Sequence, residues 1–342
     1  MKLFVGLQKG NMIKFADCHN DLLLGVLHQK ERGISDPFGD FWLPQLKEGN
    51  VNLQVLPVYV EEQFIGEGSL RRSMILFENA WQIAEKHKSD VALCTNSGDV
   101  TRANDEGKIA LVLAVEGAEA VGSSLEFFDL FYRMGVRMLS LTWNRRTMFA
   151  DGVGEQDTGG KLTSLGIEAV AEMERLGMIL DVSHISENGF WHVADVATKP
   201  FIASHSSMFA LQPHPRNLRD DQVKRIVEGG GFVSLNAFGA FLSDSATVSS
   251  MIDHVEYALN LAGAGNVGFG FDFMRDLIAQ VDPVLGNTLV DVSQWPFVNG
   301  LDRPSDLATF GVELEKRLGA ELANDVAWRG MTAMMERLLP LA

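Results

Sequence analysis

Residues 110–116 read ALVLAVE, which is six apolar residues followed by one carboxylate. A run this short and this uniformly apolar is typical of a strand that is buried on both faces, as in a parallel sheet. Similar runs recur along the chain, and together they predict eight strands. These strands are expected at 13–18, 51–58, 110–115, 136–141, 178–182, 201–204, 231–235 and 267–271.

Segments with the apolar spacing of an amphipathic helix lie between most of these runs. Alternation of strands and helices favours a parallel sheet, and about eight repeats of it predict closure into a barrel. We therefore expect an α/β fold, a single (β/α)₈ barrel of the TIM type that spans residues 1–342. The clearest helices are expected at 70–88, 163–176, 219–228 and 248–261.

Two segments do not fit this alternation. The apolar run at 91–94 is one more than the barrel needs. Residues 274–301, which contain two prolines and two glycines, are predicted to form a long loop near the active-site mouth. A loop of this length is usually a lid, a binding wall or an interface, and a plain surface excursion is the alternative.

The chain has 342 residues and a formal net charge of −16 at pH 7. This acidic balance argues against a nucleic-acid or anionic-membrane surface, because either needs a basic face. An anionic small substrate stays open, since a pocket with divalent metals can be locally positive. With two cysteines, no signal-peptide pattern and no long apolar span, the protein is expected to be cytoplasmic.

Histidines and carboxylates lie where the predicted strands end, and such ends converge on one mouth of a barrel. These side chains are normal zinc ligands, and a carboxylate that binds through both oxygens can bridge two metals. Taken singly, each has an ordinary explanation: a helix cap, a buried ion pair, or a hydrogen-bonded core histidine. Their convergence predicts a centre with two zinc ions. The predicted ligands are His19, Asp21, Glu116, His184 and His205.

Two further polar residues are expected at the same mouth. Asp272 ends the eighth predicted strand, and a rim carboxylate that binds no metal can act as a general base, with an inter-loop salt bridge as the alternative. Arg216 lies in the loop after the sixth strand and can hold a substrate carboxylate through two hydrogen bonds. Its alternative is a surface ion pair with Asp220 or Asp221. Glu119, in contrast, is expected to be solvated.

Five segments carry a family resemblance: DCHNDL at 17–22, AVEG at 114–117, LDVSHIS at 180–186, SHSS at 204–207 and RN at 216–217. They are similar to segments of the membrane dipeptidase (renal dipeptidase) family of zinc peptidases, peptidase family M19, within the amidohydrolase-like barrels. The family matches occur in the same order and run to about residue 272, which is most of the chain.

The resemblance implies a division of roles. One zinc would be bound by His19 and Asp21, the other by His184 and His205, with Glu116 as the bridge. Asp272 would relay a proton between the bridging metal hydroxide that attacks the amide and the leaving amine. Arg216 would take the C-terminal carboxylate of a small dipeptide, whose C-terminal residue can have the D configuration.

The chain departs from the family at two places. The family sequence Asp-Phe-Asp-Gly reads DFMR at 272–275, which keeps the first aspartate. The family sequence Thr-His after the fourth strand reads TWN at 142–144. Trp143 therefore replaces the histidine that contacts the developing oxyanion, and Trp143 and Asn144 are predicted to contact the substrate.

The leading interpretation is a zinc-dependent dipeptidase that acts on a small-molecule substrate, without nucleic acid or membrane. The alternative is another metal-dependent amide or lactone hydrolase on the same barrel, its specificity altered by Trp143. A third reading is a zinc-bound protein with little turnover, and retention of Asp272 argues against it, because a non-catalytic site needs no proton shuttle. The resemblance also implies a homodimer.

Overall fold

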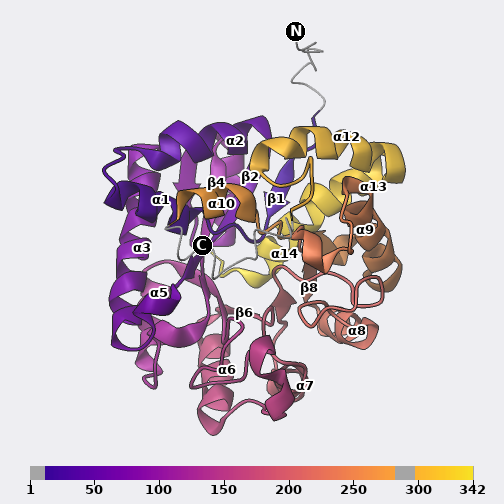
Figure 1. Cartoon of the computed structure of the whole chain (residues 1–342). Coiled ribbons are helices and arrows are strands. Elements are labelled where there is room, and N and C mark those ends of the chain that lie inside the picture. Colours follow the sequence, from indigo (N-terminus) through magenta and orange to yellow (C-terminus); the bar gives the residue numbers. More distant parts are fainter. Residues whose placement is uncertain (1–11, 282–296, 342) are drawn as a thin grey trace.

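The computed structural model describes residues 12–281 and 297–341. Eight parallel strands stand in the order β2-β1-β9-β8-β7-β6-β5-β4, and pairing of β2 with β4 closes the ring (Figure 1). The predicted barrel is confirmed, because each of the eight apolar runs supplies one strand. The barrel strands are β1 (Phe15–Asp17), β2 (Val51–Tyr59), β4 (Ile109–Glu116), β5 (Val136–Ser140), β6 (Ile179–Asp181), β7 (Ile202–Ala203), β8 (Phe232–Leu235) and β9 (Val267–Phe269).

The apolar run at 91–94 forms a further strand, β3 (Val91–Leu93), outside the ring. This strand pairs with residues 109–111 of β4, whereas β5 joins β4 only from Leu113 onward. β3 therefore occupies the part of the β4 edge that β5 leaves uncovered. The extra run satisfies backbone hydrogen bonds at that edge and is not a ninth barrel strand.

Helices cover the outside of the barrel (Figure 1). Within residues 12–281 and 297–341, every helix is too short or too polar for a transmembrane span. The helices are α1 (Leu22–Glu31), α2 (Leu43–Glu48), α3 (Glu67–Lys86), α4 (Ser97–Asp105), α5 (Glu126–Arg133), α6 (Ser164–Leu176), α7 (Glu187–Val196), α8 (Asp220–Glu228), α9 (Val248–Ala262), α10 (Met274–Gln280), α12 (Leu307–Leu318), α13 (Ala320–Asn324) and α14 (Gly330–Leu338).

The four clearest predicted helices are confirmed. In α6, the residues at the two ends explain why the sequence predicts where the helix begins and ends. The hydroxyl of Thr163 accepts a hydrogen bond from the backbone N–H of Gly166, which satisfies a donor that the first turn leaves free. The helix ends at Gly177, whose φ of 74° lies in the left-handed region. Glycine adopts that conformation without the steric cost of a Cβ.

The loop predicted over residues 274–301 is wrong in its first part, because Met274–Gln280 forms α10. A helix of seven residues is too short to show a clear apolar period, and tertiary contacts stabilise it instead. Gln280 accepts a hydrogen bond from Trp42 through its side chain (3.0 Å), and its backbone carbonyl accepts one from Arg32 (2.8 Å). Residues 282–296, also part of the predicted loop, lie outside the described residues.

The barrel interior is packed with side chains at the end opposite the strands' carboxyl termini. Interior residues such as Ala16 and Val112 form one cluster with Met331, Met334 and Met335 of α14. The outward-facing residues of the strands form a second, larger cluster with the surrounding helices. Because α14 fills the amino-terminal end, a binding site can open only at the carboxyl ends of the strands.

Gly270 links β9 to the segment after β7. A Cβ on Gly270 would lie 1.9 Å from the backbone carbonyl oxygen of Ser204, so an added methyl group must displace backbone. We expect Gly270→Ala to destabilise the protein by about 1–3 kcal/mol, the usual cost of overpacking, and to lower the melting temperature by several degrees. Thermal denaturation followed by circular dichroism measures the change.

Gly265→Ala is the matched control, because nothing lies within 4 Å of the added Cβ. We expect its melting temperature to stay close to that of the unmodified chain. Equal melting temperatures for the two variants would contradict the close approach at Gly270.

Candidate metal centre

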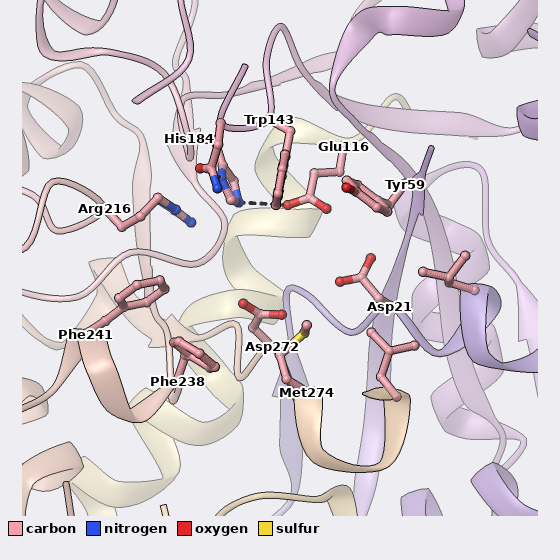
Figure 2. A pocket seen from close by; sticks show the side chains of 13 residues that line it. Asp21, Tyr59, Glu116, Trp143, His184, Arg216, Phe238, Phe241, Asp272 and Met274 are labelled. Carbon is pink, nitrogen blue, oxygen red and sulfur yellow. Dashed lines mark hydrogen bonds and ion pairs between the residues drawn. The ribbon is translucent and has the colours of Figure 1, made fainter. Parts of the chain in front are cut away.

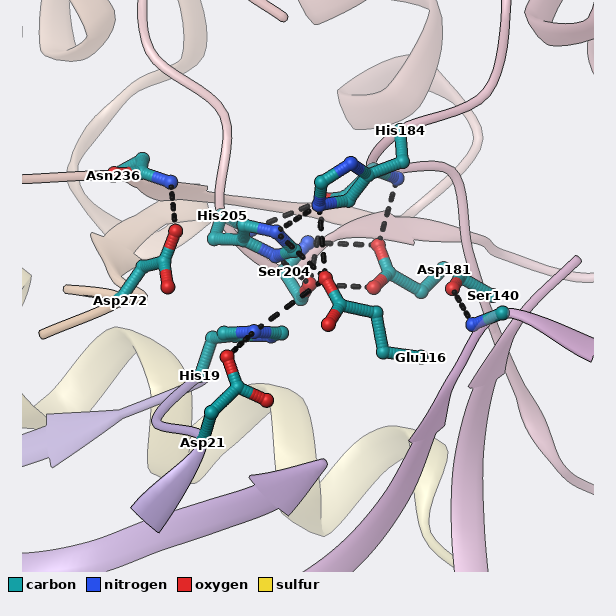
Figure 3. Close-up of polar contacts among 12 residues, drawn as sticks. His19, Asp21, Glu116, Ser140, Asp181, His184, Ser204, His205, Asn236 and Asp272 are labelled. Atoms are coloured by element: carbon teal, nitrogen blue, oxygen red, sulfur yellow. Dashed lines mark hydrogen bonds and ion pairs between the residues drawn. The ribbon is translucent and has the colours of Figure 1, made fainter. Parts of the chain in front are cut away.

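The five predicted ligands meet at the carboxyl end of the barrel (Figure 3). His19 and Asp21 follow β1, Glu116 ends β4, His184 follows β6 and His205 follows β7. Oε1 of Glu116 lies 2.8 Å from Nε2 of His184, 3.4 Å from that of His205 and 3.6 Å from that of His19. Oδ2 of Asp21 lies 3.3 Å from Nε2 of His19. The carboxylate of Glu116 is therefore at the centre of the cluster.

Hydrogen bonds fix the tautomers of two of the imidazoles. Nδ1 of His184 lies 2.7 Å from the side-chain oxygen of Asn144, which can only accept, so Nδ1 carries the proton. The hydroxyl of Ser204 donates to Asp181 and lies 2.7 Å from Nδ1 of His205, so this nitrogen also donates. Both Nε2 atoms are left with lone pairs, and they face each other at 2.8 Å. Two lone pairs aimed at one point fit a bound cation.

The electrostatics of the cluster also fit a cation. Burial holds the pKa values of His184 and His205 well below the ordinary value, so both rings stay neutral, the form that binds metal. Burial, reinforced by Asp21 and Asp272, raises the pKa of Glu116. Burial opposes protonation of His19, but Glu116 and Asp21 raise its pKa to about 10. Two buried carboxylates and the half-buried Asp272 thus compete for positive charge that divalent metals can supply.

Asp272 lies closer to the metal ligands than its predicted role as a general base requires. Its carboxylate and the ligand atoms of His19 and Asp21 all lie within 4.8 Å of one another. Asn236 donates a 3.0 Å hydrogen bond to one oxygen of Asp272, and burial raises the pKa of this carboxyl group. The geometry allows Asp272 to contact both a metal ion and a reacting water molecule.

Two residues of the centre have backbone conformations that non-glycine residues rarely adopt. The φ angle is 68° at His184 and 57° at Asp272. Such conformations cost of order 1–3 kcal/mol and persist only where the surroundings enforce them. Each turns its side chain toward the shared centre directly after a barrel strand ends (Figure 3).

A cavity opens above the centre (Figure 2). The other predicted site residues all line this cavity: Arg216, Trp143, Asn144 and Asp272. The remaining lining residues are Asp21, Leu24, Tyr59, Glu116, His184, Phe238, Phe241, Met274 and Leu277.

Arg216 is a buried cation without a carboxylate partner among the described residues. Its guanidinium donates to the backbone carbonyl of His205 (3.1 Å) and to the hydroxyl of Ser206 (3.4 Å), and its Nε has no partner in the described part of the chain. Burial lowers the pKa of Arg216 to about 10. The surface ion pair with Asp220 or Asp221 is not formed, and the unused donor fits an anionic ligand.

The expectation that Glu119 is solvated is wrong. Its side chain is 6% exposed, and one of its oxygens accepts a 2.8 Å hydrogen bond from Nε of Arg145. The Arg145 guanidinium lies 5.1 Å from the ring centroid of Trp143 and 5.7 Å from that of Tyr59. Glu119 therefore neutralises a cation that packs on two aromatic rings of the cavity wall.

Tyr59 was missed as a site residue. It ends β2, and its register partner in β4 is Glu116. Its hydroxyl is buried, and burial raises its pKa while the nearby Arg145 guanidinium opposes that rise. A tyrosine at the end of an apolar strand is unremarkable in a sequence, and only the pairing of β2 with β4 places it beside a ligand.

A closed (β/α)₈ barrel with buried imidazoles and carboxylates at its carboxyl-terminal mouth defines a metal-dependent hydrolase. The sequence pattern of the family described as membrane dipeptidase (Peptidase family M19) matches residues 10–325. The chain belongs to this family, as its five motif segments predict.

Relatives and solved structures agree with this assignment. An uncharacterized dipeptidase, C965.12, of Schizosaccharomyces pombe is 33% identical over 312 residues, which cover 83% of this chain and 73% of that protein. Dipeptidase tcpJ of Claviceps purpurea is 28% identical and covers 90% of this chain and 76% of its own length. The crystal structure of a metallopeptidase from Rhodobacter sphaeroides, liganded with a phosphinate mimic of the dipeptide L-Ala-D-Ala, has a TM-score of 0.84 and 25% identity, covering 96% and 100% of the two chains.

Ser204→Ala tests how the centre holds its ligands. The change removes the hydroxyl that accepts from Nδ1 of His205, so the ring loses the contact that fixes its tautomer. Such changes to the partners of metal ligands typically weaken affinity 10–100-fold. We expect that loss for Zn²⁺ in a competition titration against a chromophoric chelator.

Ser207→Ala is the control, because the Ser207 hydroxyl is also buried but donates to the backbone carbonyl of Asn236. Its Zn²⁺ affinity should change less than about threefold. If both variants bound Zn²⁺ equally well, the Ser204 contact would have no part in metal binding.

Proposed function

We propose that this protein is a zinc-dependent dipeptidase with two zinc ions, hydrolysing small dipeptides that have a free C-terminal carboxylate. The proposal rests on one observation: the cluster of candidate metal-binding residues and the buried cation Arg216 lie at the same cavity. Membership of the membrane dipeptidase family supports the reaction class. The dipeptide mimic bound by the Rhodobacter sphaeroides metallopeptidase supports the substrate class.

Two overlapping groups of donors support two metal ions. One group is His19, Glu116 and His205, and the other is His19, Asp21 and Asp272. With His184 beside Glu116, the cluster offers three imidazoles and three carboxylates, the donor set that zinc prefers in hydrolases. Metal ions bound here would supply Lewis acidity, which activates water and polarises the carbonyl group of the scissile amide.

The chain's own residues position the substrate and move the proton. Arg216 holds the C-terminal carboxylate through its unused N–H groups. Hydrolysis then joins the water oxygen to the carbonyl carbon and breaks the C–N bond. Asp272 takes the proton that the water loses and returns it to the leaving amine nitrogen. Asn236 keeps the Asp272 carboxylate oriented through its 3.0 Å hydrogen bond.

Trp143 favours a second candidate, a different amide or lactone hydrolase on the same barrel. The indole ring lies 5.2 Å from the Tyr59 ring and 5.9 Å from the His184 ring, measured between centroids. It therefore narrows the cavity next to the reacting groups. A substrate panel that includes N-acyl amino acids and lactones separates this candidate from a dipeptidase.

We also propose a cytoplasmic location and a homodimer. Cys18 and Cys94 are free and buried, which fits a reducing compartment. The homodimer rests on the family resemblance alone.

The test of the proposal is hydrolysis by protein purified without chelator from zinc-supplemented medium. We expect metal analysis to give about two zinc equivalents per chain and dipeptides to be cleaved. The matching dipeptide amides should react at least about tenfold more slowly, because a charge-assisted hydrogen bond to Arg216 is lost. Arg216→Met should remove this difference while keeping both metals.

Metal-loaded protein that cleaves lactones or N-acyl amino acids but no dipeptide would establish the second candidate instead. A folded protein that retains close to no zinc would overturn the proposal. Equal effects of Arg216→Met on dipeptides and on their amides would contradict the role of Arg216 as the carboxylate anchor.

Trp143→Phe tests what the indole contributes. This change keeps an aromatic ring but removes the N–H donor, and we expect kcat to fall less than about tenfold because the ring mainly packs. Loss of a hydrogen bond to the developing oxyanion would instead cost about 10²–10³-fold. Tyr59→Phe is the matched variant, and we expect the larger loss there, since its buried hydroxyl lies at the strand end beside Glu116. Steady-state kinetics with metal content measured in parallel decide between the two donors.

A further inference from the structure

The order of the strands fixes the direction in which a bound dipeptide runs. Arg216 follows β7, and Tyr59 ends β2. Four strand steps separate β2 from β7 in either direction around the ring of eight, so the two strands are opposite each other. Figure 2 shows Arg216 and Tyr59 on opposite sides of Glu116. With its carboxylate at Arg216 and its amide at the metal ligands, a dipeptide must place its N-terminal residue toward β2.

The cavity wall on the β2 side is apolar. Leu24 of α1, Tyr59 of β2 and Leu277 of α10 form a small buried cluster that is separate from the barrel core. Trp143 and Met274, both half-buried, pack against this cluster. All five side chains line the cavity, and we call them the β2-side wall.

The β2-side wall contains no carboxylate and no cation that could pair with a charged substrate side chain, and Tyr59 stays neutral because burial raises its pKa. Among the other described lining residues, the charged or titratable groups are Asp21, Glu116, His184 and Asp272 of the candidate metal centre, and Arg216 at the far side. A charged N-terminal side chain placed against the wall would lose its hydration without gaining an ion pair. An apolar side chain would instead be removed from water by apolar neighbours.

The wall is also held in place from behind. The backbone carbonyl of Gln280, at the end of α10, accepts hydrogen bonds from Gln29 and Arg32 of the α1 segment, each 2.8 Å long. Arg145 packs on the Trp143 and Tyr59 rings and is fixed by its ion pair with Glu119. A preformed wall discriminates between side chains better than one that must be ordered by the ligand.

We propose that the β2-side wall is the subsite for the N-terminal side chain, and that it makes this enzyme selective for dipeptides with a large apolar N-terminal residue. The inference rests on the proposed dipeptidase function. Leu277 and Met274 come from α10, and Trp143 comes from the segment after β5. Together with α1 and β2, four separate parts of the chain shape the subsite. The selectivity is a property of these side chains and not of the metal ligands.

The test compares kcat/KM for Leu-Ala, Phe-Ala, Gly-Ala, Asp-Ala and Lys-Ala with the zinc-loaded enzyme. Burial of a leucine or phenylalanine side chain predicts that Leu-Ala and Phe-Ala exceed Gly-Ala by about 10–100-fold. Asp-Ala and Lys-Ala should fall below Gly-Ala. Equal values for all five dipeptides, or a preference for the charged ones, would overturn the subsite.

Two variants test whether the preference for an apolar N-terminal residue depends on the β2-side wall. Leu277→Ala should lower kcat/KM for Leu-Ala about tenfold and for Gly-Ala less than about threefold. Met274→Lys places a cation on a half-buried position and should raise the ratio of Asp-Ala to Leu-Ala at least about tenfold. Unchanged ratios in both variants, with zinc content and melting temperature retained, would show that the N-terminal side chain binds elsewhere.

Phe238→Ala is the control, because Phe238 lines the same cavity and its ring lies 5.0 Å from that of Phe241, which packs on Arg216. It should leave the Leu-Ala to Gly-Ala ratio within about twofold and change instead the preference for the C-terminal residue. If the zinc-loaded protein cleaved none of the dipeptides, the proposed function itself would fail. A dipeptidase without the predicted order of substrates would contradict the subsite alone.

Discussion

The buried carboxylates at the barrel mouth are the constraint on which the rest of the site depends. Asp21 and Glu116 are buried, Asp272 beside them is half-buried, and desolvation raises the pKa of Glu116 and of Asp272. Buried charges of one sign are costly unless they are paired or coordinate a metal. The neighbouring imidazoles of His184 and His205 are held neutral and contribute lone pairs, whereas Glu116 and Asp21 raise the pKa of His19 to about 10. Divalent cations bound at this mouth would offset the charge of these carboxylates.

Holding these groups at fixed distances requires the strand ends to be tied to one another. Asp17 does this between β1 and β9, because its carboxylate accepts the backbone N–H groups of His19 (3.2 Å) and Phe271 (2.9 Å). Asp181 does the same between β6 and β7, accepting the backbone N–H groups of Ser183 and Ser204 at 2.9 Å. Each carboxylate thus fixes two neighbouring strand ends, and each is followed within a few residues by a predicted metal ligand. The barrel's carboxyl-terminal edge is rigid where the chemistry requires it.

Much of this was predictable because the ligands follow apolar runs whose end is visible in the sequence. Glu116 closes the run ALVLAVE, and the convergence of strand ends brings it to His184 and His205 without further information. Tyr59 and Glu119 were not predictable in this way, because their roles depend on side-chain contacts between strands and loops. The seven residues of α10 have too little periodicity to be recognised, and contacts with α1 and Trp42 decide their conformation.

The residues that the sequence predicts are those of the candidate metal centre at the strand ends. The residues that it does not predict belong to the cavity wall. Metal ligands must lie at strand ends, where the backbone is fixed by sheet hydrogen bonds, so their placement follows from the barrel alone. Substrate walls tolerate change because apolar packing is non-directional, and Trp143 and Met274 can depart from the family pattern without moving a ligand. Trp143 stands where the resemblance implies a histidine, and Met274 lies two residues after Asp272. Both side chains line the cavity, so under the proposed function they would set which substrate side chain it accepts without being among the groups that would bind metal and move the proton.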